Sequence, residues 1–258
     1  MADWNAEVYA RVSAPQFEWG KRVLERLPLT GDETVVDAGC GAGRLTELLL
    51  KRLPRGRVIA LDASEAMLEK AREHLAVFGE QVTFVRADLA THVVRPPVDA
   101  VFSTATFHWV LDHDALFAGL RATLRTGGRL VAQWGGGANL ARLRGRTASL
   151  RASEAYARFF AGFHEPWHYA SAEETRGRLE TTGFVDVKAW LELAPVRFDD
   201  AASFGEFLSH VILRDELPRL PDDGARRSYV GALVDLASRE DPPFELDYCR
   251  LNADARRG

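Results

Sequence analysis

The chain has 258 residues, a formal net charge of −4, a hydrophobic fraction of 47% and a charged fraction of 27%. These values predict a globular protein with a sizeable core, and the charge excludes a general attraction to nucleic acid or to anionic membranes. No apolar run reaches the ~20 residues of a transmembrane helix, no secretory signal opens the chain, and its two cysteines make no disulfide framework, which together predict a cytoplasmic protein.

The amino-terminal segment is aromatic and amphipathic, and it includes Trp4, Tyr9, Phe17 and Trp19. Apolar residues at helical spacing continue to Leu27, and a proline and a glycine then end the predicted helix. Because this segment precedes the first strand, it can fold over a ligand site, although ordinary core packing also explains its aromatic residues.

A glycine-rich loop follows the first predicted strand, which spans residues 34–38 and ends in an acid, Asp37, and an alanine. Gly39, Gly41 and Gly43 form the loop, and an amphipathic helix follows it. Glycine has no Cβ, so the backbone can turn sharply and a ligand can lie against the main chain. A turn without any ligand is the alternative, because a glycine motif alone is a weak signal.

Further strands and amphipathic helices then alternate. Strands are expected at residues 57–61, 82–86, 99–103 and 129–134. Ser64 is the predicted N-cap of a helix over residues 64–72, and two glycines at 127–128 are expected to end a helix over residues 114–125. This alternation predicts a mostly parallel sheet with helices on both faces and a ligand site at the carboxyl ends of the strands.

The pattern changes after three consecutive glycines at residues 135–137. We expect a long helix near residues 140–162, an aromatic loop at 164–169, a helix at 172–182, an edge strand at 184–191, helices between 201 and 240, and a last strand at 244–252. Gly183 is predicted to cap the helix before the edge strand, and Pro218 and Pro221 are predicted to break the later helical stretch.

The spacing of the glycines and of two acids narrows the choice of ligand class. A dinucleotide site would show Gly-x-Gly-x-x-Gly, but here Arg44 stands at the position of the third glycine. Asp62, after the second strand, suits a ribose diol, and Asp88, after the third, can accept a hydrogen bond from an adenine amine. Either acid alone could be a helix cap or a solvated loop residue. Their placement at successive strand ends beside the glycine loop indicates an adenosyl ligand.

Residues 35–44, 60–64, 86–89 and 124–131 together resemble the motifs of class I S-adenosylmethionine-dependent methyltransferases. The resemblance implies a Rossmann-like, seven-stranded, mostly parallel sheet whose last two strands form an antiparallel pair. It also implies a single domain, which we divide into a core, an N-terminal cap and a helical lid. The core takes residues 30–135 and 183–258, the cap residues 1–29, and the lid residues 137–182 and 200–241.

The same resemblance implies S-adenosyl-L-methionine as cofactor and assigns residues to its parts. Gly39 and Gly41 would line the methionine part, which Ser103 would also approach, and Asp62 would hold the ribose. Asp88 and Leu89 would hold the adenine, with Met67 packed near it. The full predicted set of cofactor-binding residues is Asp37, Gly39, Cys40, Gly41, Asp62, Ala63, Met67, Asp88, Leu89 and Ser103.

The segment after the fourth strand, residues 104–110, is similar to small-molecule carboxyl methyltransferases, a group that includes the trans-aconitate and malonyl-ACP enzymes. The similarity implies a small-molecule acceptor, with Tyr9, Trp19 and Trp109 as candidate substrate contacts. Enzymes that methylate a flipped base amine carry an acid or amide, two prolines and an aromatic residue here. This segment contains no such signature, so nucleic acid is not the expected substrate.

Methyl transfer mainly requires a nucleophile held in line with the methyl group in a site without water, because a sulfonium already contains a good leaving group. A carboxylate acceptor needs no general base, whereas a phenol or hydroxyl does, and His108 is the candidate base at the strand edge. A packed histidine that only shapes the pocket is the alternative. Methylation of a larger natural product on oxygen or nitrogen, and a cofactor-binding module without catalysis, are the competing functions.

Two further patterns have both a functional and a structural explanation. Arginines that could bind a substrate carboxylate, or simply cover a solvated helix, are Arg142, Arg144, Arg146, Arg151, Arg197 and Arg250. Residues 164–168 match the zinc-protease pattern His-Glu-x-x-His, but that chemistry needs both histidines on one continuous helix, and Pro166 interrupts it. We therefore predict no metal site.

Overall fold

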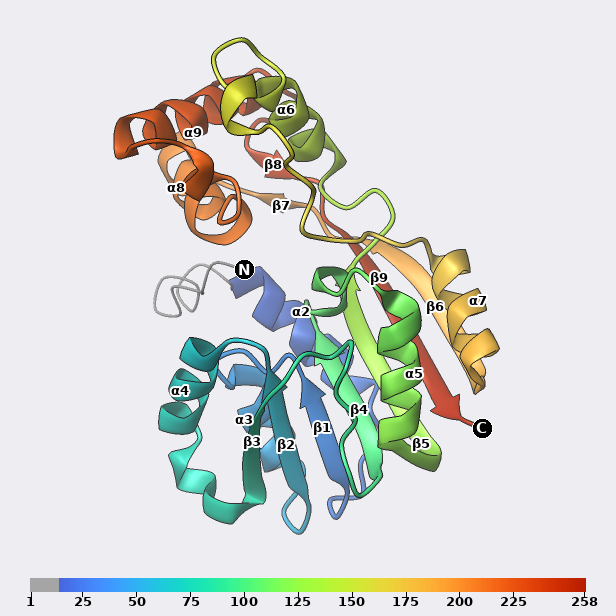
Figure 1. Cartoon of the computed structure of the whole chain (residues 1–258). Helices are drawn as coiled ribbons and strands as arrows, with labels where there is room; N and C mark the ends of the chain where they lie inside the picture. Colours follow the sequence, from blue (N-terminus) through green and yellow to red (C-terminus); the bar gives the residue numbers. More distant parts are fainter. Residues whose placement is uncertain (1–13) are drawn as a thin grey trace. The chain divides into compact units, whose positions relative to one another are not determined.

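The computed structural model describes residues 14–258 (Figure 1), so Tyr9 lies outside the described residues. The described chain forms two compact units. The sheet unit comprises residues 14–137, 167–192 and 250–258, and the helical unit comprises residues 138–166 and 193–249. Within residues 14–258, no helix is both long and apolar enough to cross a membrane.

A seven-stranded sheet forms the centre of the sheet unit, in the order β3-β2-β1-β4-β5-β9-β6. The strands are β1 (Thr34–Ala38), β2 (Arg57–Asp62), β3 (Val82–Arg86), β4 (Val98–Thr104), β5 (Leu124–Gly135), β6 (Phe184–Leu193) and β9 (Cys249–Arg257). β1 to β5 pair in parallel, and β9 runs antiparallel to β5. The start of β6 lies beside the end of β9, since Gly258 donates to the Gly183 carbonyl, so these two strands are also antiparallel. The predicted fold class is confirmed.

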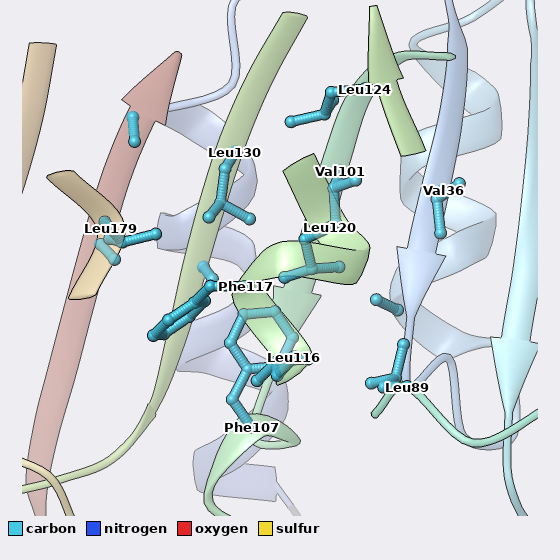
Figure 2. Packing of buried hydrophobic residues seen from close by; sticks show 14 of the residues in the cluster. Val36, Leu89, Val101, Phe107, Leu116, Phe117, Leu120, Leu124, Leu130 and Leu179 are labelled. Atoms are coloured by element: carbon cyan, nitrogen blue, oxygen red, sulfur yellow. The ribbon is translucent and has the colours of Figure 1, made fainter. Parts of the chain in front are cut away.

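Helices cover both faces of this sheet (Figure 1). They are α2 (Ala14–Glu25), α3 (Arg44–Lys51), α4 (Glu65–His74), α5 (His113–Thr123) and α7 (Ala172–Thr182). Figure 2 shows Phe117 and Leu120 of α5 packed toward Leu130 of β5, with Leu179 of α7 in the same cluster. The opposite cluster takes its helical members from α2, α3 and α4, among them Val23 and Leu49. The helical periodicity of these leucines is what places them on one buried face.

The helical unit has its own elements. They are α6 (Ala141–Arg151), a 3₁₀ turn (Ala157–Phe159), β7 (Val196–Arg197), α8 (Ala201–Phe207), a π turn (Leu208–Ile212), a second 3₁₀ turn (Leu217–Arg219), α9 (Asp223–Ser238) and β8 (Glu245–Leu246). β7 and β8 form a two-stranded antiparallel sheet. Helices broken around Pro218 and Pro221 were predicted here, and the break is confirmed between Leu208 and Asp222.

Three predicted boundaries are wrong. The expected long helix over 140–162 ends at Arg151, because Ser153 donates both its N–H and its hydroxyl to the Leu150 carbonyl and closes a turn. The glycines at 127–128 do not end α5, which stops at Thr123. They belong to an irregular part of β5, where the register shifts between Val98 and Ala100. The predicted last strand is two strands, β8 and β9.

Candidate functional site

The glycine loop turns the chain from β1 into α3 with three left-handed residues, Gly39, Gly41 and Gly43, at φ of 84°, 54° and 85°. A Cβ on Gly39 would lie 2.1 Å from Oγ1 of Thr106, so the neighbouring segment fills that space. Among residues 14–258, a Cβ on Gly41 would meet nothing within 4 Å. Gly39 is therefore needed for close packing, whereas Gly41 leaves open space against the main chain, as a ligand requires.

Asp62, at the end of β2, holds the loop. Its Oδ2 accepts from the Gly41 N–H at 2.9 Å, and its Oδ1 accepts from the Ser64 N–H at 2.9 Å. A carboxylate can accept several hydrogen bonds, and a diol of a ribose is a group that it can hold. The position of this acid is fixed by the loop that it would serve.

Asp37 lies beneath the same loop and is 2% exposed. Burial is the main cause that raises the pKa of its carboxyl to about 7, and the charge of the nearby Asp62 acts in the same direction. The hydrogen bond donated by Thr46 Oγ1 at 2.6 Å opposes them, because it lowers this pKa. Burial also raises the pKa of the Cys40 thiol, and the charges of both aspartates add to this effect. Cys40 is therefore a neutral packing residue of the loop and not a nucleophile.

The residues predicted for the adenine end lie after β2 and β3. Asp88 is exposed and accepts from the Ala90 N–H at 2.9 Å, whereas the adjacent Leu89 is buried. Met67 is 3% exposed on α4, whose N-cap is Ser64 as predicted, and Ala63 is exposed. An exposed acid beside buried apolar side chains is the arrangement that recognises an adenine edge and face.

Ser103, at the end of β4, ties this strand to β1. Its hydroxyl is 1% exposed and donates to the Ala38 carbonyl at 2.6 Å. This bond explains why a serine suits a position between two strand ends. It also means that the hydroxyl faces a backbone carbonyl of the neighbouring strand.

His108 lies in the 3₁₀ turn Phe107–Trp109, directly after β4, and is 8% exposed. Its Nδ1 accepts from the Gly135 N–H at 3.4 Å, so a neutral ring in this arrangement carries its proton on Nε2. The ring of Trp109 lies 4.9 Å from it and that of Tyr169 lies 5.7 Å from it. His108 is thus held as a hydrogen-bond donor among aromatic rings.

We call His108, Trp109, Trp167 and Tyr169 the aromatic wall. The rings of Trp167 and Tyr169 stack at 5.8 Å, and Trp167 meets Trp109 edge-on at 5.8 Å. The backbone N–H of His168 donates to the His108 carbonyl at 2.8 Å and brings this loop to the turn. The sequence identified the loop as aromatic but gave no sign that Trp167 and Tyr169 would join His108.

Two further histidines, His113 and His168, lie next to the aromatic wall. His113 is 2% exposed, its Nε2 lies 3.1 Å from the Phe107 carbonyl, and its ring stacks on that of His168 at 4.5 Å. Burial lowers the pKa of His113 to about 4, so the ring is neutral near pH 7 and donates through Nε2. In the sequence, His168 stands out only as part of the His-Glu-x-x-His pattern, and His113 does not stand out at all.

Trp19 lies on α2, is 6% exposed and has the guanidinium of Arg250 4.8 Å from its ring centroid. Arg250 is opposite Gly135 in the β5–β9 register. Because the Gly135 N–H donates to His108, Gly135 and Arg250 are at the strand ends next to this histidine. In the helical unit, Arg142 pairs with Glu240 and Glu245, and Arg151 pairs with Glu165 and Glu216. Arg146 is 8% exposed and lies 3.6 Å from Glu240, Arg144 is half-buried on the same helix, and Arg197 is exposed in β7.

The His-Glu-x-x-His pattern does not form a helix, because residues 163–170 have no regular structure. Glu165 binds Arg151, and His168 stacks on His113, so its members have other partners. Within residues 14–258, no three histidine, cysteine or acidic side chains are grouped in a way that could hold a metal ion.

Comparison with known proteins first concerns the fold. The chain is similar to Haemonchus contortus phosphoethanolamine N-methyltransferase 2 in complex with S-adenosyl-L-methionine, with a TM-score of 0.62 and 18% identity over 98% of this chain and 57% of that chain. The YcgJ protein of Bacillus subtilis matches with a TM-score of 0.63 and 15% identity, over 93% of this chain and 98% of that one. The [4+2]-cyclase SpnF matches as well, with a TM-score of 0.59 and 15% identity over 93% of this chain and 81% of that one. These likenesses therefore establish the fold alone.

Comparison of sequences is more specific. A family model described as a methyltransferase domain matches residues 35–128. Trans-aconitate 2-methyltransferase of Rhodopseudomonas palustris (strain BisB5) is 31% identical over 254 residues, which cover 94% of this chain and 93% of that protein. The protein of the same name from Azoarcus sp. (strain BH72) is 38% identical over 133 residues, or 52% of this chain and 51% of that protein. With the glycine loop and the two strand-end acids, these matches show that the chain belongs to the class I S-adenosylmethionine-dependent methyltransferases.

Proposed function

We propose that this S-adenosylmethionine-dependent methyltransferase transfers its methyl group to a carboxylate oxygen of a small acid. Similarity along 94% of the chain to a protein named trans-aconitate 2-methyltransferase supports this acceptor class. The observation that carries the proposal is the state of His108, whose Nδ1 lone pair is used by the Gly135 N–H. A carboxylate is the acceptor that can react without a general base. A cytoplasmic location, and an acceptor other than nucleic acid, remain predictions of the sequence.

The residues around the glycine loop fit the cofactor. The open space at Gly41 admits a ligand to the main chain, and the carboxylate of Asp62, which accepts from the Gly41 N–H, is the group that would accept from the ribose hydroxyls. In this proposal Gly39, Cys40 and Gly41 line the methionine part and Asp37 lies below it. Asp88 and Leu89 hold the adenine beside Ala63 and Met67. We assign Ser103 to fixing the strand end, since its hydroxyl donates to Ala38.

The bound cofactor supplies a methyl group on a sulfonium, and the protein has to place an acceptor in line with it. The aromatic wall offers apolar ring faces that keep water from this position. Nε2–H of His108 can donate to the second oxygen of the acceptor carboxylate, which orients the first oxygen toward the methyl group. Trp19 and Trp109 would contact the remainder of the acid.

Product analysis tests the acceptor. The protein is incubated with the cofactor and with trans-aconitate, other di- and tricarboxylates, phenols or amines, and methylated products are identified by mass spectrometry. We expect methyl esters from the carboxylates and none from phenols or amines. Titration calorimetry with the cofactor, run beside it, separates a protein that binds without turnover from one that does not bind. Methylated phenols in place of esters would contradict the proposal.

A further inference from the structure

A polar groove lies in the sheet unit over β5, β9 and β6, whereas the glycine loop follows β1. Its volume is about 240 Å³, and its walls come from the segment after α2, the middle of β5, the end of β9 and the start of β6. The segment of β5 that lines it is Arg129–Val131, whereas the end of this strand, Gly135, contacts His108. The groove is therefore separate from the proposed cofactor and acceptor sites.

The charges in this groove do not balance. Four basic and two acidic side chains line it, which leaves a net charge of +2: Arg26, Arg129, Lys188, Arg256, Asp186 and Asp254. Arg26 pairs with Asp254 at 3.1 Å, and Arg256 pairs with Asp186 at 3.2 Å. In the part of the chain that the structure describes, no acid pairs with Arg129 or Lys188. These two cations carry the excess charge.

The register of the sheet makes this excess costly. Arg129 of β5 lies directly opposite Arg256 of β9 in the antiparallel pair. Side chains at such positions are about 5 Å apart at Cβ, and like charges there destabilise the pairing, an effect that the pairing of Arg256 with Asp186 only partly offsets. A local conflict of this kind within an otherwise consistent sheet indicates a function for the charges involved. An anion in the groove would remove the conflict.

We propose that the groove binds a compact oxyanion of charge −2, such as inorganic phosphate or a small dicarboxylate. The guanidinium of Arg129 can hold two oxygens of such an anion with parallel hydrogen bonds, and Lys188 adds a point charge from β6, on the far side of β9. Asp254 and Asp186 are neutralised by their arginines and do not oppose binding. The bound anion stabilises the middle of β5 and the two antiparallel strands β9 and β6.

The test compares a groove variant with a charge-matched control. The groove variant is Arg129→Gln with Lys188→Gln, both exposed positions. The control is Arg55→Gln with Lys51→Gln, two exposed positions of the sheet unit that do not line the groove. Inorganic phosphate and succinate are titrated separately by calorimetry and by thermal unfolding, at constant ionic strength set with chloride. Neither readout depends on methyl transfer.

We expect the wild type and the control to bind one phosphate per chain and to gain thermal stability with it. The groove variant is expected to bind about tenfold more weakly or worse, as loss of two charge-assisted contacts implies. Binding of succinate in place of phosphate would support the site and identify the carboxylate class. Without any oxyanion, Arg129→Gln alone should unfold at the same temperature as the wild type or higher, because it removes the like-charge pair.

Three outcomes overturn the proposal. Equal phosphate affinity in the groove variant and the wild type would place the anion elsewhere. Absence of both binding heat and thermal stabilisation with either anion in the wild type would show that the groove does not take them. A lower unfolding temperature of Arg129→Gln in oxyanion-free buffer would show that Arg129 contributes to the fold.

Discussion

The two units of the molecule use polar side chains in opposite ways. In the sheet unit, two hydrophobic clusters supply the core, and the polar residues gather at the strand ends, where Asp62 and Asp88 bond mainly to nearby backbone N–H groups. The helical unit buries a charged network instead. Arg151 bonds to Glu216 and Glu165, and Tyr229 donates to Glu216 at 2.5 Å. The strand-end acids of the first unit belong to the proposed ligand site, whereas the buried acids of the second unit bind its own arginine and tyrosine side chains.

This difference answers a question that the sequence left open. The arginines near residues 142–151 could have bound a substrate or covered a solvated helix, and neither explanation fits Arg142 or Arg151. Both pair with acids inside the helical unit, and the side chain of Arg151 is only 12% exposed. Their role is structural.

The largest expected effect comes from breaking the charged network. Arg151→Met leaves the carboxylate of Glu216 buried without its cation, and we expect a loss of about 3–5 kcal/mol in the free energy of unfolding. Urea unfolding measures it. The matched control is Arg125→Met, because Arg125 pairs with Asp99 at 2.6 Å but its side chain is 60% exposed. That change should cost about 1 kcal/mol or less. Equal losses in the two variants would contradict the structural role of Arg151.

The next effect concerns Asp37 in the sheet unit and depends on pH. Its carboxyl has a pKa of about 7 in the folded protein, against an ordinary value of 3.8. An unfolded chain releases this proton near pH 4 and the folded protein keeps it, so stability falls as pH rises toward 7. The fall is at most roughly 4 kcal/mol, at 1.36 kcal/mol per pKa unit.

Urea unfolding at pH 5 and pH 8, compared between the wild type and Asp37→Asn, isolates this contribution. The variant should lose less stability than the wild type between the two pH values. Cofactor affinity should show the opposite trend and rise with pH through 7, because a positively charged ligand favours the ionised carboxylate. A wild type and variant with parallel pH profiles would show that Asp37 does not hold a proton.

A smaller effect separates ligand space from backbone strain. Gly41 and Gly79 both have a positive φ, of 54° and 52°, and among the described residues a Cβ on either would meet nothing within 4 Å. Alanine at Gly41 should cost about 1–2 kcal/mol of stability. Alanine at Gly79 should cost at least as much, about 1–3 kcal/mol, because its ψ of −127° belongs to a conformation that is almost restricted to glycine. Only Gly41→Ala should also weaken cofactor binding, by about tenfold, because its Cβ enters the space assigned to the ligand. Calorimetric titration of both variants measures this, and equal affinities would remove Gly41 from the site.

Local sequence patterns predicted much of the sheet unit. The β-branched run at Thr34–Ala38, the cap at Ser64 and the glycine at Gly183 each specify their structure within a few residues, and all three are confirmed. The aromatic wall could not be predicted in the same way. Trp167 and Tyr169 reach His108 because the His168 N–H donates to a carbonyl 60 residues earlier in the chain. Contacts at such a separation have no local signature.

The end of α6 is a second feature that local sequence patterns could not predict. Residues 152–162 contain good helix formers, yet the helix stops at Arg151. Arg151 is drawn to Glu165 and Glu216, and Tyr156 packs on Tyr229 at 5.0 Å. Tertiary contacts override helix propensity here, because a few tenths of a kcal/mol per residue cannot compete with a buried charged network.

The smallest predicted effect is at His108, and it decides which acceptor the sheet unit serves. Glutamine retains a donor in the place of Nε2–H, so His108→Gln should lower kcat with a carboxylate acceptor by less than about tenfold. Loss of a general base would instead lower it by about 10²–10⁴-fold and remove one arm of the pH profile. Turnover measured from pH 6 to 9 on the acceptor that product analysis identifies distinguishes the two. A large loss on a hydroxyl acceptor would mean that the Gly135 N–H does not hold the Nδ1 lone pair during turnover, and that His108 accepts the proton that this hydroxyl releases on methylation.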